Sequence, residues 1–230
     1  MEFNSRLAMI LSVCLILSLL PFGRRLLFPF QIFTTWVHEC CHAFTALLLG
    51  ASSIRITVSA DGSGLTEYKI RQSKLKQATV ASSGYLGASI CGCILFYFSV
   101  RSTRVATAIT ADQMVCLLVA LIGLSILFWV RNLFGLISLL LFGIALGSLH
   151  YTQAARYQET VLVFLSLQTA LNALFDLKTL LGLSASKAGQ SDAHTMQKLF
   201  VLPHWFWAMI WLGISVFLML QTTRALKFHF

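Results

Sequence analysis

Charged side chains are scarce in this chain of 230 residues, where they make up 11% and include only 8 aspartates and glutamates. Soluble domains carry about 25% charged residues, so the chain lacks the polar surface that a water-soluble fold needs. Apolar residues account for 57%, and the mean hydropathy is +0.80. The composition argues against a soluble domain and predicts an integral, multi-pass membrane protein whose surroundings are the lipid bilayer.

Negative charge is the scarcer kind, and the 17 lysines and arginines give a net charge of +9. In a soluble protein this excess would suggest nucleic-acid binding. Here the basic residues lie between apolar runs, as loop charges do under the positive-inside rule, so we expect no nucleic-acid partner. With seven spans, more of them fall on the side that holds the N-terminus and residues 53–70. That side is therefore predicted to be cytoplasmic. The membrane itself is expected to be the cytoplasmic or plasma membrane.

The six cysteines all lie in apolar runs. Free cysteine behaves as a small hydrophobic residue and is usually buried, so we expect buried thiols rather than disulfides. Cys91 and Cys93 are too close together for a usual metal pair without further partners.

Seven apolar stretches have about the length that a helix needs to cross a bilayer. They cover residues 7–21, 26–49, 78–100, 114–130, 133–149, 161–181 and 204–221. Residues 53–70 alternate apolar and polar around Asp-Gly-Ser-Gly, which predicts a β-hairpin. A short helix is predicted to begin at Ser191 or Asp192. The fold class is therefore an all-α polytopic membrane protein with six to seven transmembrane helices, one short β-hairpin after the second helix, and a single domain over residues 1–230.

The second apolar stretch contains three ionisable residues, His38, Glu39 and His42, in an H-E-x-x-H arrangement. Each such group near the centre of a membrane helix costs roughly 2.5–3.5 kcal/mol on insertion scales, so a functional reason is expected. Four residues apart on a helix, two imidazoles share a face and can bind one zinc ion. Glu39 can then act as general base for a water that zinc activates. Interhelical hydrogen bonding alone is the weaker alternative.

A catalytic zinc site normally has three protein ligands. At 1.5 Å per residue, His38 and His42 lie about 18 and 24 Å into the second stretch, and Asp176 lies about 22 Å into the sixth, which runs in the same direction. We therefore predict Asp176 as the third ligand. Asp192 is the alternative, although its loop would have to fold back and an aspartate there is also a favoured helix N-cap. Asn172, one turn before Asp176, is either a donor to a developing oxyanion or a plain buried amide.

Two further groups receive no chemical role. His150 and His204 lie near the ends of apolar stretches and are expected to be interfacial or hydrogen-bonded residues rather than ligands. Gly84, Ala88 and Gly92 recur every four residues, which is typical of helices that approach each other closely.

Six segments, in order along the chain, resemble the site-2 protease-type membrane zinc metallopeptidases, most closely their compact B-type branch. The segments are HECCHAFTALLLG, ITVSADGSGLTEY, SSGYLGASICG, WVRNLFGLISLLLFG, NALFDL and SDAHTMQKLFVLPHWFWAMIW. The resemblance implies a zinc-dependent membrane endopeptidase, a single membrane-embedded metallopeptidase-like domain with one Zn²⁺ per chain. It assigns the zinc to His38, His42 and Asp176, and the general base to Glu39. The implied substrate is a transmembrane protein or peptide, cut within or next to its membrane segment.

The alternative function is a non-proteolytic membrane protein of the same fold that binds or regulates other transmembrane proteins. Such a binder has no need of Glu39. Haem binding is disfavoured because two ligands one turn apart cannot occupy opposite haem faces, and a transporter would be expected to show paired halves or broken helices. The predicted hairpin is either a sheet edge that receives substrate as an added strand or a connecting loop.

Overall fold

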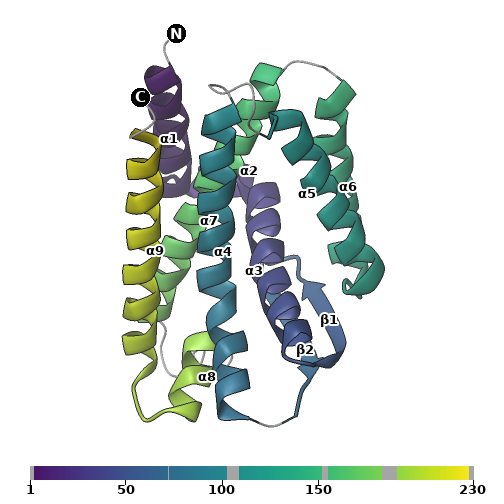
Figure 1. Cartoon of the computed structure of the whole chain (residues 1–230), viewed down its shortest axis with the longest axis vertical. Coiled ribbons are helices and arrows are strands. Elements are labelled where there is room, and N and C mark those ends of the chain that lie inside the picture. The colour runs from purple at the N-terminus through teal and green to yellow at the C-terminus, as the bar shows by residue number, and fades with distance from the viewer. Residues whose placement is uncertain (1–2, 72, 103–108, 152–154, 183–190, 228–230) are drawn as a thin grey trace.

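The computed structural model describes residues 3–71, 73–102, 109–151, 155–182 and 191–227. In chain order their elements are α1 (Phe3–Leu19), α2 (Pro21–Leu26), α3 (Phe28–Leu48), β1 (Ser52–Val58), β2 (Gly64–Lys69), α4 (Lys74–Ser102), α5 (Ala111–Phe128), α6 (Leu133–Tyr151), α7 (Ala155–Gly182), α8 (Asp192–Leu199) and α9 (His204–Lys227). The long helices stand side by side, and the two strands lie along α3 at one end of the molecule (Figure 1).

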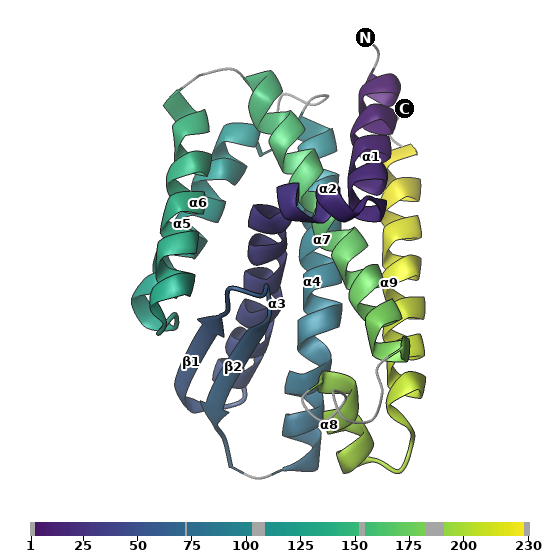
Figure 2. The ribbon, with the colours of Figure 1, turned by 180° about the vertical axis from the view of Figure 1, so that it is seen from behind.

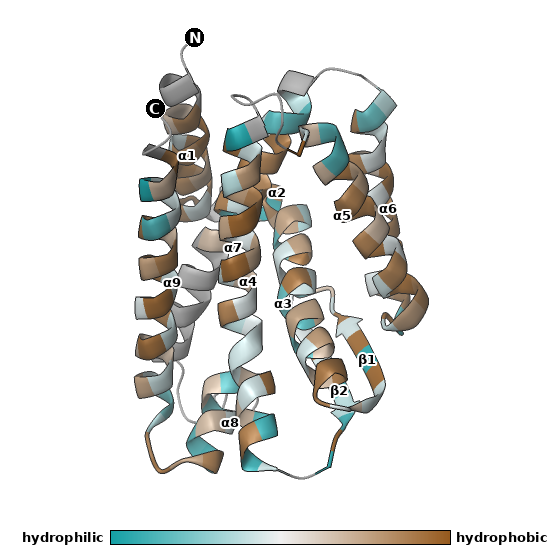
Figure 3. Ribbon diagram, viewed as in Figure 1, coloured by the Kyte–Doolittle hydropathy of each residue, from teal (hydrophilic) through white to brown (hydrophobic). Residues whose placement is uncertain are grey.

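The predicted elements are present: each of the seven apolar stretches falls mostly on one helix, the hairpin follows α3, and a short helix begins at Asp192. Within the described part of the chain, α4, α5, α6 and α9 are long and apolar enough to cross a membrane. The predicted count of six to seven spans is therefore not confirmed. The polar residues of the H-E-x-x-H motif interrupt the apolar run of α3. The apolar part of α1 covers only Leu7–Leu19, which is shorter than these four helices. Figure 3 shows apolar residues along α5, α6 and α9, with polar residues gathered towards the upper ends of α5 and α6.

The N-terminal part of the chain differs from the seven-span topology. That topology puts the N-terminus and the hairpin on the same side, but they lie at opposite ends of the molecule (Figure 1). Helix α2, which begins at Pro21, crosses between α1 and α3, and these two run in the same direction (Figure 2). The chain thus turns sideways at Pro21 instead of reversing. The charge comparison that placed the hairpin in the cytoplasm rests on the reversed topology and no longer holds.

The hairpin is held in place by the turn between α5 and α6. The Ile56 amide donates to the Trp129 carbonyl oxygen at 2.8 Å, and the Arg131 amide donates to the Ile56 carbonyl oxygen at 3.0 Å. The Asn132 side chain donates to the Val58 carbonyl oxygen at 2.7 Å and accepts from the Val58 amide at 3.1 Å. The α5–α6 turn therefore covers one edge of β1, and β2 pairs with its other edge.

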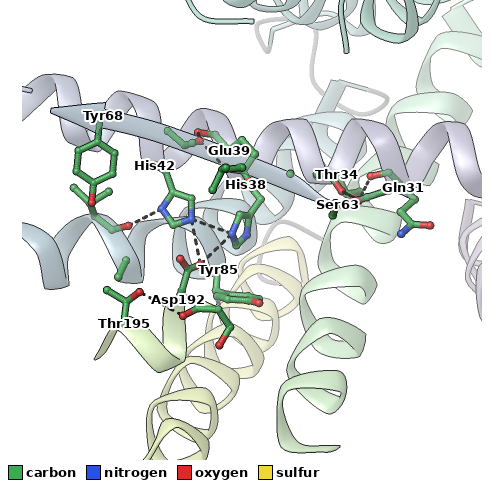
Figure 4. Close-up of a pocket in the computed structure, with 18 residues that line it drawn as sticks. Gln31, Thr34, His38, Glu39, His42, Ser63, Tyr68, Tyr85, Asp192 and Thr195 are labelled. Carbon is green, nitrogen blue, oxygen red and sulfur yellow. Dashed lines mark hydrogen bonds and ion pairs between the residues drawn. The ribbon is translucent and has the colours of Figure 1, made fainter. Parts of the chain in front are cut away.

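Two apolar clusters orient the elements that matter for function. One face of α3 is buried through Ile32, Phe33 and Trp36, and the Trp36 indole donates to the Ser125 hydroxyl of α5 at 2.8 Å. A second cluster joins α8 to α4 and α9 through Ala78, Ala81, Tyr85, Ala193, Met196, Ala208 and Trp211. With the apolar face of α3 buried in this way, its histidines and glutamate turn towards β2, α4 and α8 (Figure 4).

All six cysteines are free thiols, as expected. Cys14 and Cys93 are buried, whereas Cys91 and Cys116 are exposed. The expectation of burial is therefore wrong for these two, because an apolar run in a membrane protein places a side chain in the bilayer as readily as in the protein interior.

Candidate metal centre

The two histidines of the H-E-x-x-H motif meet in space. His38 and His42 lie one turn apart on α3, and their Nε2 atoms are 3.0 Å apart (Figure 4). His42 is buried and His38 is half-buried. The helical spacing thus places both imidazoles on one face, as the sequence predicted.

Asp192 is the carboxylate that reaches both histidines. Its Oδ2 atom lies 3.1 Å from Nε2 of His38 and 3.1 Å from Nε2 of His42. Asp192 was the alternative to Asp176 as third ligand. The side chains of Asp176 and Asn172 lie outside the described residues, so their predicted roles remain predictions.

Helix α8 brings Asp192 to this position. The Ser191 hydroxyl caps the helix by accepting from the His194 amide at 3.3 Å, and Asp192 follows as the first helical residue. Ala193 and Met196 are buried against α4 and α9, which fixes the helix beside the histidines. The Ser191 cap leaves the carboxylate of Asp192 free to face α3.

The Nδ1 hydrogen bond of His42 suits a metal ligand. Its Nδ1 atom lies 2.7 Å from the Val80 carbonyl oxygen, which can only accept, so Nδ1 carries a proton and Nε2 is the nitrogen that a metal would meet. The two Nε2 atoms and the Asp192 oxygen form a triangle with sides of 3.0 to 3.1 Å. Three such atoms repel one another unless a proton or a cation lies between them. Ligand atoms of a tetrahedral zinc ion lie about 3.3 Å apart, so this donor set fits zinc.

Gly84 of α4 leaves space in front of the two ligating nitrogens. A Cβ atom added there would lie 2.4 Å from Nε2 of His38 and 2.4 Å from Nε2 of His42. Any larger residue would therefore occupy the volume that an ion needs. Gly84 matches the small-residue pattern that was interpreted only as helix packing, so its part in the site was missed.

Glu39 lies next to the metal-ligand set and is buried, with 5% of its surface exposed. The Thr66 hydroxyl of β2 lies 2.6 Å from Oε2 of Glu39 and 3.0 Å from its carbonyl oxygen, and can donate to either. On the same strand, a Cβ atom added to Gly64 would lie 2.6 Å from Oε1 of Glu39. The hairpin thus holds the carboxylate on one side, and Glu39 borders the same cavity as the histidines.

These groups line one polar cavity of about 410 Å³. Its walls come from α3, the hairpin, α4 and α8, through Gln31, Thr34, Thr35, His38, Glu39, His42, Gly62, Ser63, Gly64, Leu65, Thr66, Tyr68, Val80, Ala81, Tyr85, Ser191, Asp192 and Thr195. The Tyr85 ring packs edge-on against His38, with centroids 4.7 Å apart, and stacks on Trp211 at 5.3 Å. The volume is in the range of small-molecule and peptide-side-chain pockets.

Two of the cavity-lining groups outside the apolar spans have shifted pKa values. Burial alone would raise the pKa of Asp192, but the nearby charge of His42 and the hydrogen bonds from both histidines lower it overall. Burial, together with the negative charge of Asp192, raises the pKa of Tyr68. Asp192 is therefore an ionised carboxylate and Tyr68 a neutral phenol at neutral pH.

His150 and His204 lie away from this centre and form hydrogen bonds, as predicted. His204 Nδ1 lies 3.1 Å from the Gln197 side-chain oxygen, and His150 Nδ1 lies 2.7 Å from Oδ1 of Asp112.

A helical fold with apolar spans, an H-E-x-x-H helix and a facing carboxylate defines a membrane metallopeptidase of the site-2 protease type. The Peptidase M50B-like family matches residues 7–222, so the chain belongs to this family. Its members are metalloprotease hydrolases that in general depend on zinc, and the apolar helices make this chain an integral membrane protein. Comparisons with curated proteins and with solved structures found no match.

Proposed function

We propose that this chain is an intramembrane zinc endopeptidase that hydrolyses peptide bonds within or next to transmembrane segments of its substrates. The observation that supports this best is the meeting of His38, His42 and Asp192 beside Glu39, at a polar cavity among apolar helices. Ligand set and base together are what hydrolysis needs, whereas a protein that only binds other helices needs neither.

We assign the metal to His38, His42 and Asp192, in place of Asp176. When bound, one Zn²⁺ at this site would lower the pKa of a water molecule and polarise the scissile carbonyl. The Val80 carbonyl oxygen keeps the His42 ring in the tautomer that exposes Nε2. Tyr85 packs against His38 and limits its rotation.

Glu39 is the proposed general base. It takes a proton from the attacking water at Oε1, while Thr66 holds Oε2. The water oxygen bonds to the carbonyl carbon, the carbon–nitrogen bond breaks, and the proton passes from Glu39 to the departing amine. Burial of Glu39 keeps this transfer away from bulk water.

The hairpin is proposed to receive the substrate. Thr66 and Tyr68 of β2 line the cavity, whereas Glu67 and Lys69 are exposed and do not line it. Because the α5–α6 turn covers the outer edge of β1, an extended peptide would add at β2. An unfolded segment of a transmembrane substrate could then reach Glu39 and the metal ligands.

The test is metal content and cleavage on the same preparations. The full chain is purified in detergent without chelator, and zinc per chain is measured by elemental analysis. Cleavage is followed by mass spectrometry on single-span peptides reconstituted with the protein. We expect one zinc at this site in the wild type and in Glu39→Gln, its loss in His42→Ala and Asp192→Ala, and cleavage in the wild type alone.

Other outcomes would correct the proposal. Zinc that is lost in Asp176→Ala and kept in Asp192→Ala would restore Asp176 as the ligand. Bound zinc with no cleavage of any peptide by the wild type would favour the non-proteolytic binder. Absence of zinc at His38 and His42 in the wild type would contradict the enzyme altogether.

A further inference from the structure

A second group of metal-ligating side chains lies at the other end of the molecule. Asp112 and Cys116 are one turn apart on α5, and His150 is in the last turn of α6. One ligand atom from each lies within 4.8 Å of the others. We call Asp112, Cys116 and His150 the outer cluster, and His38, His42 and Asp192 the inner cluster. The outer cluster lies where α5 begins and α6 ends, opposite the hairpin (Figure 1).

We propose that the outer cluster is a second divalent-metal site that binds zinc or a chemically similar ion. His150 would then be a ligand, contrary to the expectation from the sequence. Thiolate and imidazole favour zinc and the later first-row metals, whereas calcium and magnesium prefer ligands made only of oxygen. The sulfur of Cys116 therefore determines the class of ion.

The distances need only small adjustments to admit such an ion. Sγ of Cys116 lies 3.9 Å from Nδ1 of His150, and Nδ1 lies 2.7 Å from Oδ1 of Asp112. Around a tetrahedral zinc ion, sulfur and nitrogen are about 3.6 Å apart, and oxygen and nitrogen about 3.3 Å. These two pairs therefore need changes of roughly half an ångström. The third pair, Cys116 and Asp112, lies within 4.8 Å and has to close further.

A buried amide supports the carboxylate from behind. The Gln158 side chain of α7 is 3% exposed, and its nitrogen donates to Oδ1 of Asp112 at 3.1 Å. The same nitrogen lies 3.0 Å from the Leu149 carbonyl oxygen near the end of α6. A hydrogen bond of this kind to a ligand carboxylate orients it towards a metal. Gln158 thus fixes Asp112 relative to the end of α6, where His150 lies.

The outer cluster is accessible and has no general base. The exposed fractions of the His150 and Asp112 side chains are 51% and 39%, so an ion can enter from water at the end of the apolar helices. The buried Glu39 lies beside the inner cluster, and none of the three residues of the outer cluster is a comparable buried carboxylate. Metal at this site would join α5 to α6 and stabilise the bundle without contributing to hydrolysis.

The competing explanation is an ion pair between Asp112 and His150 in which Cys116 takes no part. The two differ in the part played by sulfur, which an ion pair does not need. This inference does not rest on the proposed peptidase function.

The experiment uses the full chain with His38→Ala and His42→Ala, so that the inner cluster cannot bind. Cobalt(II) is added in detergent, and a sulfur-to-cobalt charge-transfer absorption is recorded, with zinc as competitor. We expect one cobalt per chain with this absorption, and its loss in Cys116→Ser. His150→Ala should weaken binding about tenfold or more, as expected for loss of a ligand. Cys91→Ser, which removes the other exposed thiol, should leave the absorption unchanged.

Absence of the absorption, or its persistence in Cys116→Ser, would overturn the second site. If the double-histidine variant does not fold, zinc per chain is compared between the wild type and Cys116→Ser. A loss of one zinc in Cys116→Ser supports the site, and an unchanged zinc content contradicts it.

Discussion

The inner and outer clusters use similar ligands but differ in their surroundings. At the inner cluster, 7% of the His42 side chain and 22% of the Asp192 side chain are exposed, against 51% for His150 in the outer one. The inner cluster also has a buried glutamate and a cavity. We therefore predict that ligand chemistry alone does not make a catalytic centre in this protein. Enclosure and a positioned base give the inner cluster its proposed activity, and the outer cluster is proposed to be structural.

The largest effect on the cleavage rate is expected from removing the proposed general base, Glu39. No residue of the outer cluster has this role. Glu39→Gln should lower the cleavage rate by about 10³-fold, since general acid–base catalysis contributes roughly 10²–10⁴-fold, while bound zinc is unchanged. Peptide cleavage in reconstituted vesicles and elemental analysis measure the two quantities. Glu67→Gln, at an exposed position of β2, is the matched control and should keep full activity. Equal rates for wild type and Glu39→Gln would remove the proposed difference between the clusters.

The second effect concerns the space in front of the inner ligands. Gly84→Ala should abolish zinc binding at this cluster, because the added methyl would lie 2.4 Å from both Nε2 atoms. Zinc content measures the effect, and zinc at the outer cluster should persist. Gly213→Ala on α9 is the control, because a Cβ there has no neighbour within 4 Å. It carries the same gain in helix propensity. Normal inner-cluster zinc in Gly84→Ala would show that the cavity is not the metal pocket.

A smaller effect is expected at the group that positions the base. Thr66→Val removes the hydrogen bond to Oε2 of Glu39 and should lower kcat about tenfold, with KM and zinc content nearly unchanged. The rate constant and KM are measured by steady-state cleavage of the reconstituted peptide. Thr66→Ser, which keeps the hydroxyl, should restore kcat, and an unchanged kcat in Thr66→Val would show that Thr66 only packs against Glu39.

The smallest effect on catalysis should come from the outer cluster. Cys116→Ser with His150→Ala should change the cleavage rate by no more than about twofold, because neither residue lies in the cavity. Added zinc should raise the thermal unfolding temperature of the wild type more than that of this variant, because a ligand that binds only the folded state stabilises it. A large loss of cleavage in the variant would instead show that the outer cluster affects catalysis at the inner cluster.

The elements were largely predictable, whereas their directions were not. Apolar length located the helices, and the alternation around Asp-Gly-Ser-Gly located the hairpin, because both signals are local. The predicted direction of α1 relative to α3 was wrong, because hydropathy does not reveal that the chain turns sideways at Pro21. The two helices also start at different depths. Helix α7 starts at the upper end of the molecule, whereas α3 starts part of the way down (Figure 1). Depths counted from the start of each apolar stretch were therefore a weak basis for choosing Asp176.

The roles of the residues that support the inner cluster could not be predicted from the sequence. Gly84 belonged to a recognised small-residue pattern, but that pattern cannot tell close helix packing from space kept open for an ion. Thr66 lay in the predicted hairpin, with no sign that its hydroxyl reaches Glu39. Both roles depend on how α4 and β2 approach α3.

By itself, the sequence determined the membrane class and the relation among His38, Glu39 and His42. Four residues on a helix place two imidazoles on one face whatever surrounds them, because helical geometry is local. Only the tertiary structure decided which carboxylate faces them. Asp192 is 150 residues from His42 along the chain, and the packing of α8 against α4 and α9 brings it within 3.1 Å. Contacts of that sequence separation arise from the burial of apolar side chains elsewhere, which no local spacing encodes.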